Sequence, residues 1–186
     1  MYTARGQTLG LPRTKRREPS HALSDRLARD AKRPAAAAFW PRGAMRASAS
    51  QLHYGHQGSA MVRGLSFTPA DAVGLPSLSL YLGGRPVVLQ GDEALPTSKQ
   101  VHVGLVLDPA SGNAGLYVDG MQVAAAAMSG SLSDLRDVDN WLGRSQVVSD
   151  PGLSGSLSEL RIYGRALTQQ ELVTSRDAGP DPHFLD

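Results

Sequence analysis

Two apolar segments that flank the dipeptide Asp119-Gly120 place the strongest constraint on the fold. Residues 116–118 precede the dipeptide and residues 121–126 follow it. Type I′ turns need a positive φ angle at both central residues, and Asp-Gly is one of the few dipeptides that adopt this conformation readily. The sequence therefore predicts a β-hairpin whose turn is formed by Asp119 and Gly120.

Alternating apolar residues indicate further strands upstream of this hairpin. Residues 77–82 place a leucine at every second position, and Gly83-Gly84 predicts a tight turn into a partner strand over residues 85–90. Residues 101–107 also alternate, with Val and Leu along one face and His102 on the other. We interpret His102 as a strand residue rather than as a catalytic base.

Short, evenly spaced strands without helices between them predict an all-β fold made of two packed antiparallel sheets. The 20 Gly and 12 Pro residues fit a chain with many turns. In the last predicted strand Leu160 and Ile162 share one face. Thr168 and Glu171 then form a capping box, in which the hydroxyl and the carboxylate each accept a hydrogen bond from a backbone N–H of the first turn. We expect one short C-terminal helix that ends before Gly179-Pro180.

An ordered series of motifs runs from the hairpin to this helix. It comprises Tyr117-Val118-Asp119-Gly120, Trp141-Leu142-Gly143-Arg144-Ser145, Asp150-Pro151, the strand at residues 155–163, and Arg165-Ala166-Leu167-Thr168. From about residue 36 to residue 177 the chain resembles the laminin G-like domains of the concanavalin A-like lectin/glucanase superfamily, which are jelly-roll β-sandwiches. The resemblance implies a non-catalytic recognition module of the kind appended to secreted hydrolases. Such a module is extracellular and binds a glycan or a protein surface.

The chain departs from the family pattern at three places. An aromatic residue is usual where Lys99-Gln100 stands, a Tyr where Gly152 stands, and an acidic residue where Ser158 stands. Lost aromatic rings remove surface for stacking, and a lost carboxylate weakens the case for bound calcium, which prefers several oxygen ligands. A structural or protein-interaction domain that has lost sugar binding is therefore the alternative function.

Catalysis is not expected for this chain. Enzymes of this fold that cleave sugars carry carboxylates in a Glu-x-Asp-x-Glu pattern, since retaining chemistry needs two carboxyl groups about 5 Å apart. The sequence has no such pattern, and Asp92-Glu93 falls in a predicted loop. It also has no cysteine, which excludes thiol catalysis and thiolate zinc sites. Glycoside hydrolysis is the least favoured function, and we assign no catalytic residue.

An acidic cluster precedes the Trp141 motif and contains Asp134, Asp137, Asp139 and Asn140. Its spacing lacks the ordered Asp-x-Asp-x-Asp-Gly of a calcium loop and favours a solvated polar loop. We predict no metal and no cofactor, with calcium as the alternative. The candidate ligand-binding residues are these four together with Arg144 and Asp150 of the following segment.

Trp141 is predicted to anchor the core of the sandwich, and stacking on a sugar is its alternative role. Alternation places Tyr117 on a sheet face, where packing is favoured over sugar contact. The residues predicted to be structural are Trp141, Tyr117, Asp119, Gly120, Leu160, Ile162, Thr168 and Glu171.

Residues 1–34 differ in composition from the rest of the chain. They carry nine basic and three acidic residues, a net charge of +6, so that the remaining residues carry −4. We assign residues 1–35 to a disordered basic arm, residues 36–178 to the jelly-roll domain and residues 179–186 to a tail. Non-specific attraction to nucleic acid or to a membrane surface, and an Arg-rich transit peptide, are alternative roles of the arm.

No segment is apolar enough for a membrane span or for the core of a recognisable signal peptide. We predict no specific nucleic-acid partner. The residues themselves indicate neither a cellular location nor an oligomeric state.

Overall fold

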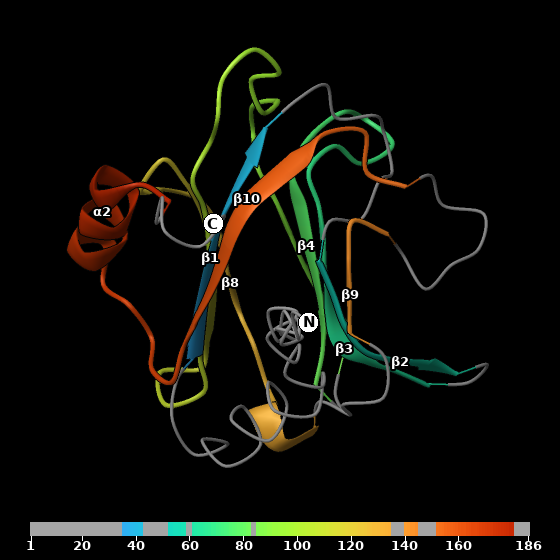
Figure 1. The fold of residues 1–186 in the computed structure, drawn as a ribbon. Helices are drawn as coiled ribbons and strands as arrows, with labels where there is room; N and C mark the ends of the chain where they lie inside the picture. The colour runs from blue at the N-terminus through green and yellow to red at the C-terminus, as the bar shows by residue number, and fades with distance from the viewer. Residues whose placement is uncertain are drawn as a thin grey trace, which may run out of the picture.

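The computed structural model describes residues 35–42, 52–58, 61–82, 85–134, 140–144 and 152–180. Within these residues, two five-stranded antiparallel sheets face each other, as Figure 1 shows. The strands of sheet A are, in spatial order, β10 (Ser156–Tyr163), β1 (Ala35–Arg42), β6 (Val103–Asp108), β7 (Asn113–Val118) and β8 (Met121–Ala127). Those of sheet B are β5 (Val87–Gln90), β4 (Ser77–Tyr81), β3 (Met61–Thr68), β2 (Leu52–Gly58) and β9 (Trp141–Leu142). The predicted two-sheet sandwich is confirmed.

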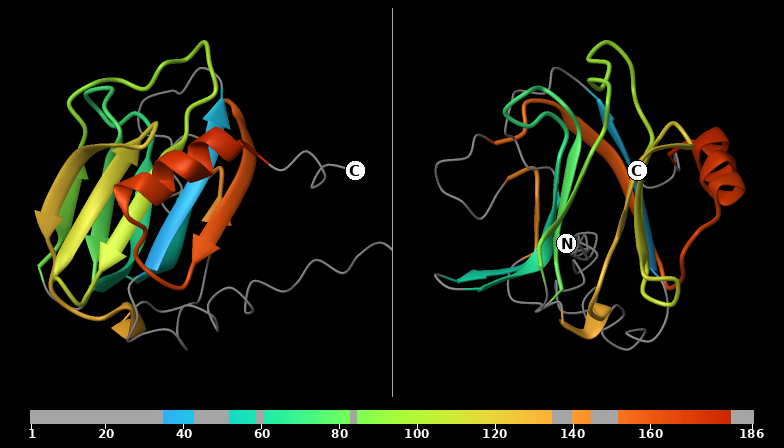
Figure 2. Two further views of the ribbon diagram at one scale, coloured as in Figure 1. Left: turned by 90° about the vertical axis from the view of Figure 1, so that its left-hand side faces the viewer. Right: turned by 180° about the vertical axis from the view of Figure 1, so that it is seen from behind.

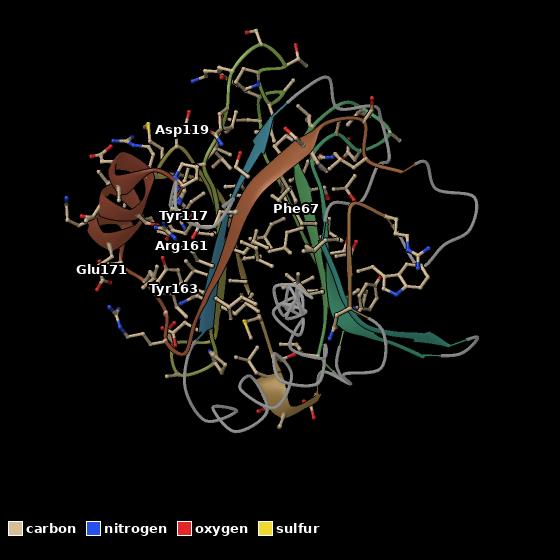
Figure 3. All side chains as sticks on the ribbon, viewed as in Figure 1. Phe67, Tyr117, Asp119, Arg161, Tyr163 and Glu171 are labelled. Atoms are coloured by element: carbon tan, nitrogen blue, oxygen red, sulfur yellow. The ribbon has the colours of Figure 1, made fainter. Side chains whose placement is uncertain are left out.

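The core lies between the sheets and is built from the inward residues of both. On sheet B, Phe67 pairs with Leu78 and Leu78 with Leu89, and these three side chains are at most 2% exposed. On sheet A, Leu105 and Leu116 pair across β6 and β7 and are equally buried. Figure 3 shows Phe67 pointing into the space between the sheets. The leucines predicted to line one face therefore do face the core.

The hairpin at Asp119-Gly120 joins β7 to β8 as predicted. Asp119 has a φ angle of 49° and Gly120 one of 78°, and the flanking residues Val118 and Met121 pair with each other. Positive φ at both central residues is the conformation that a type I′ turn requires.

One helix, α2 (Gln169–Ala178), lies across the outer face of sheet A, as the left view of Figure 2 shows. Its capping box is confirmed: the Glu171 N–H donates to Thr168 Oγ1 (3.3 Å), and the Thr168 N–H donates to Glu171 Oε2 (2.9 Å). Leu172, which is fully buried, packs against Val106 on the sheet. A Cβ at Gly104 would lie 3.0 Å from Leu172 Cδ2, so this glycine lets the helix approach the sheet closely.

Strand β10, at the edge of sheet A, also has the predicted faces. Arg161 and Tyr163 pair with Ala38 and Ala36 of β1 on the face that α2 covers. Leu160 and Ile162 alternate with them on the opposite face, and Leu160 packs against the core. The Leu160–Ile162 face is therefore the inner one.

Two strand starts differ from prediction. Strand β5 begins at Val87 rather than at residue 85, because Pro86 has no N–H to donate to a ladder. Strand β6 begins at Val103 rather than at Val101. Here the His102 N–H donates to Asp119 Oδ1 (2.9 Å) and the Asp119 N–H donates to the His102 carbonyl (2.7 Å), so this part of the backbone bonds to the hairpin turn.

Strand β3 was not predicted, although Leu65 and Phe67 alternate with Ser66 and Thr68 within it. The alternation spans only half of the strand, which begins with the irregular segment Met61-Val62-Arg63-Gly64. The predicted Gly83-Gly84 turn lies outside the described residues, and so does the predicted basic arm of residues 1–35 except for Ala35, which begins β1.

Candidate functional site

One row of residues crosses the outer face of sheet B from edge to edge. Trp141 of β9 pairs through β2 with Ser66 of β3, and the row continues through Ser79 of β4 to Val88 of β5. Paired residues share a face of a sheet, and successive residues alternate between faces. Because the neighbouring row contains the buried Phe67, the row that begins at Trp141 faces outward.

His53 of β2 stands in this row next to Trp141, and the next two positions, on β3 and β4, carry small side chains. Ser66 and Ser79 are half-buried, whereas Val88, at the β5 edge, is 58% exposed. Trp141 and Arg144 stand at the β9 edge. We call the surface formed by Trp141, Arg144, Ser66, Ser79 and Val88 the sheet B face.

The Trp141 ring is half-buried and is not among the buried core residues, so the prediction that it anchors the core is wrong. The reason is its position: Trp141 begins a two-residue strand at the edge of sheet B, and its register with β2 directs it outward. The sequence of a two-residue strand is too short to show which side chain faces the core, because only the pairing with the neighbouring strand decides this.

The guanidinium of Arg144 lies over the Trp141 ring, 3.6 Å from the ring centroid. Gly143, with a φ angle of 77°, turns the chain between these two residues, and its carbonyl accepts a hydrogen bond from the Leu153 N–H (2.8 Å). Stacking a cation on an indole stabilises the pair by about 0.5–1 kcal/mol at an exposed site. It also holds the guanidinium plane in one orientation while its N–H donors stay at the edge of that plane.

Of the other predicted ligand-binding residues, the structure describes Asp134 and Asn140. Asp134 lies in a short 3-10 helix, η1 (Leu132–Asp134), where Asp134 Oδ2 accepts a hydrogen bond from the Ser131 N–H (2.9 Å). That contact is the local turn that the solvated-loop interpretation expects. Asn140 directly precedes β9 and is half-buried. Asp137, Asp139 and Asp150 lie outside the described residues, and within the described residues no three His, Asp or Glu side chains come together as a metal site would need.

A second polar cluster ties α2 to the outer face of sheet A. Arg161 Nε donates to Glu159 Oε1 (2.7 Å), Arg161 Nη2 donates to Glu159 Oε2 (3.1 Å), and Nη2 also donates to the carbonyl of Gly179 beyond the helix (2.8 Å). Arg176 of α2 donates to the carbonyl of Asp119 in the hairpin turn (2.7 Å). Figure 3 shows Arg161, Tyr163 and Tyr117 between sheet A and the helix. These contacts hold the helix in place, as the structural interpretation of Tyr117 and Asp119 predicts.

His102 belongs to this cluster and is 1% exposed. Burial lowers the pKa of its ring to about 4; nearby Asp119 opposes this shift, while Arg176 and Arg161 add to it. The ring is therefore neutral at neutral pH. It lies on the predicted outer face of sheet A, but it is enclosed in a structural cluster, so it fits a packing role better than that of a base.

Three of the described carboxylates, Asp108, Glu171 and Asp71, have lowered pKa values. The hydrogen bond from Ser111 lowers the pKa of Asp108, and Arg165 lowers that of Glu171 to about 2. At Asp71, burial alone would raise the pKa, but hydrogen bonds from Leu75, Gln90 and Val73 outweigh it and lower the value. A general acid in glycoside hydrolysis needs a raised pKa, so these three shifts run in the wrong direction for that role.

The sandwich of two antiparallel sheets with a short helix on one outer face is consistent with a jelly-roll fold. Residues 29–173 match the family described as the concanavalin A-like lectin/glucanases superfamily, and the chain belongs to this family. No curated protein sequence matches the chain.

Solved structures with the same fold include modules attached to carbohydrate-active enzymes. Domain 4 of AbnA, an extracellular GH43 arabinanase from Geobacillus stearothermophilus, in complex with arabinotriose, is similar at 18% identity with a TM-score of 0.62, over 75% of this chain and 65% of that one. The chain thus spans just under two thirds of that domain. The CBM40 of the Ruminococcus gnavus IT-sialidase, bound to α2,3-sialyllactose, is similar at 21% identity with a TM-score of 0.62, over 77% of this chain and 82% of that one.

A heptameric SAP-like pentraxin from Limulus polyphemus is similar at 15% identity with a TM-score of 0.56, over 76% of this chain and 69% of that one. At these identities the likeness concerns the fold. Among the described residues, no helix is both long and apolar enough to cross a membrane.

Proposed function

We propose that this protein is a non-catalytic glycan-binding module and that the glycan binds on the sheet B face. The observation that carries the proposal is the Arg144 guanidinium held over the Trp141 ring at the edge of that face. Arginine donates paired, charge-assisted hydrogen bonds to oxygen acceptors, and the stacked ring fixes the direction of these donors before the ligand arrives. The side chain of Arg144 is exposed, so its donors are accessible to a ligand.

The shape of the face supports the same function. On β3 and β4 the row carries the small side chains of Ser66 and Ser79, and the larger Val88 follows on β5. A sugar chain laid along this row would bring its hydroxyls against the serine side chains and an apolar face against the edge of the indole. Two of the structures that share the fold are described with bound sugars, arabinotriose in one and sialyllactose in the other, which adds weight to a glycan ligand.

The absence of catalysis is part of the proposal. Glu159, the most enclosed of the ion-paired carboxylates described here, is held by Nε and Nη2 of Arg161 on the opposite sheet, away from the sheet B face. We expect the purified protein to release no reducing sugar from polysaccharides that it binds. Turnover that one Asp or Glu substitution abolishes would contradict this part of the proposal.

The binding test combines a glycan array with titration calorimetry on the ligands found. Replacement of Arg144 by Ala should weaken binding about 10- to 100-fold, the equivalent of one or two charge-assisted hydrogen bonds. Arg144→Lys should recover only part of this loss, because an ammonium lacks the planar set of donors. Arg85→Ala removes another exposed arginine, between β4 and β5, and should leave the affinity unchanged.

Trp141→Ala separates binding from stability. Because the ring is half-buried, we expect unfolding to become easier by about 1–2 kcal/mol rather than by the about 3–5 kcal/mol of a core tryptophan, while binding weakens as strongly as in Arg144→Ala. If Arg144→Ala and Trp141→Ala both bind the glycan with wild-type affinity, the sheet B face is not the binding site. A wild-type protein that binds no glycan would overturn the proposed function and favour a protein-interaction domain.

A further inference from the structure

A hollow of about 280 Å³ lies on the outer face of sheet A, on the opposite side of the sandwich from the sheet B face. It is bounded by β6 and β7, by Gln122 of β8, and by the residues that lead into α2, from Ala166 to Thr168. The left view of Figure 2 shows this segment crossing sheet A in front of these strands. We call this cavity the sheet A hollow.

A glycine lets an aromatic ring pack onto the floor of the hollow. A Cβ at Gly115 would lie 2.8 Å from Tyr117 Cε2 and 3.2 Å from Gln122 Nε2, so only a glycine leaves room for the Tyr117 ring and the Gln122 amide at this position. Val106 and Leu167 complete an apolar surface next to the ring. Burial raises the pKa of Tyr117, so its hydroxyl keeps its proton at neutral pH and can donate a hydrogen bond.

The rim of the hollow is polar and almost wholly uncharged. Asn113, Gln122, Ser111 and Thr168 contribute amides and hydroxyls, and the first three are on exposed parts of β7, β8 and the connecting turn. Asp108 is the one charged residue among those that line the hollow. Its carboxylate accepts hydrogen bonds from Ser111 Oγ (2.7 Å) and the Ala110 N–H (3.0 Å), and the Ser111 bond lowers its pKa, so it carries a negative charge at neutral pH.

We propose that the sheet A hollow is a second ligand site, which takes a single neutral sugar residue. An apolar floor with an aromatic ring suits the C–H face of a sugar, and the surrounding amides and hydroxyls suit its hydroxyl groups. Binding pockets for larger organic ligands span about 300–1,000 Å³, so a hollow of about 280 Å³, just below that range, suits one sugar ring and not an oligosaccharide. The Asp108 carboxylate repels anionic ligands, so uronic and sialic acids should bind this site more weakly than neutral sugars.

This site is independent of the proposed function, since it shares no residue with the sheet B face. It would give the module two places of contact with one polysaccharide or with two. Linked contacts of this kind raise the overall affinity well above that of either site when the geometry permits both.

The test is an NMR titration of the isotope-labelled full chain with galactose, glucose or arabinose, and with glucuronate as the anionic control. We expect a neutral sugar to shift the backbone amides of Gly115 and Tyr117 and the side-chain amide of Gln122, with saturation in the millimolar range, and glucuronate to shift them at least about tenfold more weakly. An absence of shifts at these groups with every neutral sugar, up to about 100 mM, would overturn the proposal. Equal binding of glucuronate would also overturn it.

Variants separate the two sites and guard against misfolding. Gln122→Ala removes an exposed rim amide and should weaken the neutral sugar about fivefold, while Gln170→Ala, an exposed glutamine on α2 outside the hollow, should change nothing. Gly115→Ala should abolish the shifts by displacing the Tyr117 ring, with a two-state unfolding curve to show that the chain still folds. Arg144→Ala should leave the NMR shifts at the sheet A hollow unchanged. Loss of glycan binding at the sheet B face and loss of sugar binding in the sheet A hollow therefore give different results. Gln122→Ala that binds like the wild type would move the sugar out of the hollow and contradict the inference.

Discussion

Acidification should destabilise this protein through His102. The ring is 1% exposed in the cluster that joins α2 to the β7–β8 turn, and burial lowers its pKa from 6.5 to about 4. Asp119, Arg161 and Arg176 are the charged groups that act on it, and the two arginines disfavour a charged imidazole. The folded state therefore holds a neutral histidine where the unfolded chain readily accepts a proton.

The sign and size follow from proton linkage. Because the folded pKa lies below the unfolded one, the unfolded state binds more protons between these values, and stability falls as the pH drops from about 6.5 towards about 4. With these two values, the loss between about pH 7.5 and about pH 5 is about 2 kcal/mol, and it levels off at about 3 kcal/mol below the folded pKa. Glu171, whose pKa is lowered to about 2 mainly by Arg165, loses its own contribution only below its unfolded value near 4.5.

The measurement is the free energy of unfolding in urea at several pH values for the wild type and for His102→Gln, which carries no titratable ring. The difference between the two proteins cancels every other titrating group that they share. We expect this difference to change by about 2 kcal/mol between about pH 7.5 and about pH 5. Parallel pH profiles over that range would refute the assignment of a buried, neutral His102.

Two substitution pairs test how α2 and the hairpin are held against sheet A. Gly120→Ala adds a Cβ 2.7 Å from Val173 Cγ2 at a φ angle of 78°, whereas Gly112→Ala adds one at a φ angle of 70° with no contact closer than 3.6 Å. We expect Gly112→Ala to lower the free energy of unfolding by about 1 kcal/mol and Gly120→Ala to lower it by about 1–3 kcal/mol more. Equal losses in denaturant unfolding would rule out tight packing of Val173 against this turn. Arg161→Leu leaves Glu159, whose side chain is 11% exposed, without its bidentate partner, and should cost about 2 kcal/mol. Glu159→Leu/Arg161→Leu should regain part of that stability, and a double variant less stable than Arg161→Leu would mean that the ion pair is not the reason for the loss.

Local sequence signals predicted the elements whose conformation depends on near neighbours. The Asp119-Gly120 turn, the Thr168–Glu171 capping box and the alternation of residues 77–82 each depend on contacts within a few residues, and each is present in the structure. Strand β3 was missed, although its second half alternates clearly. A search for alternation over windows as short as four residues would have found Leu65-Ser66-Phe67-Thr68.

Local sequence patterns predicted only part of the candidate binding site. The motif around Trp141 lies in the segment where we propose the binding site, and Arg144 is among the predicted ligand-binding residues. The direction of the Trp141 ring was predicted wrongly, because a two-residue strand has no periodicity of its own. The serines of the sheet B face were visible as the polar side of an alternating strand, but nothing in the sequence joined them to Trp141.

What the sequence alone determined is therefore the set of local conformations: strands by period-two alternation, a type I′ turn by Asp119-Gly120, and a helix start by its capping box. The tertiary structure alone decided which residues meet. Trp141 faces outward because of its register with β2, and the sheet A hollow exists because the segment before α2 lies across β6 and β7, about 50 residues away in the chain. Pairing between distant strands fixes both the partner and the face of each side chain, and the free energy of such contacts depends on residues that no local window contains.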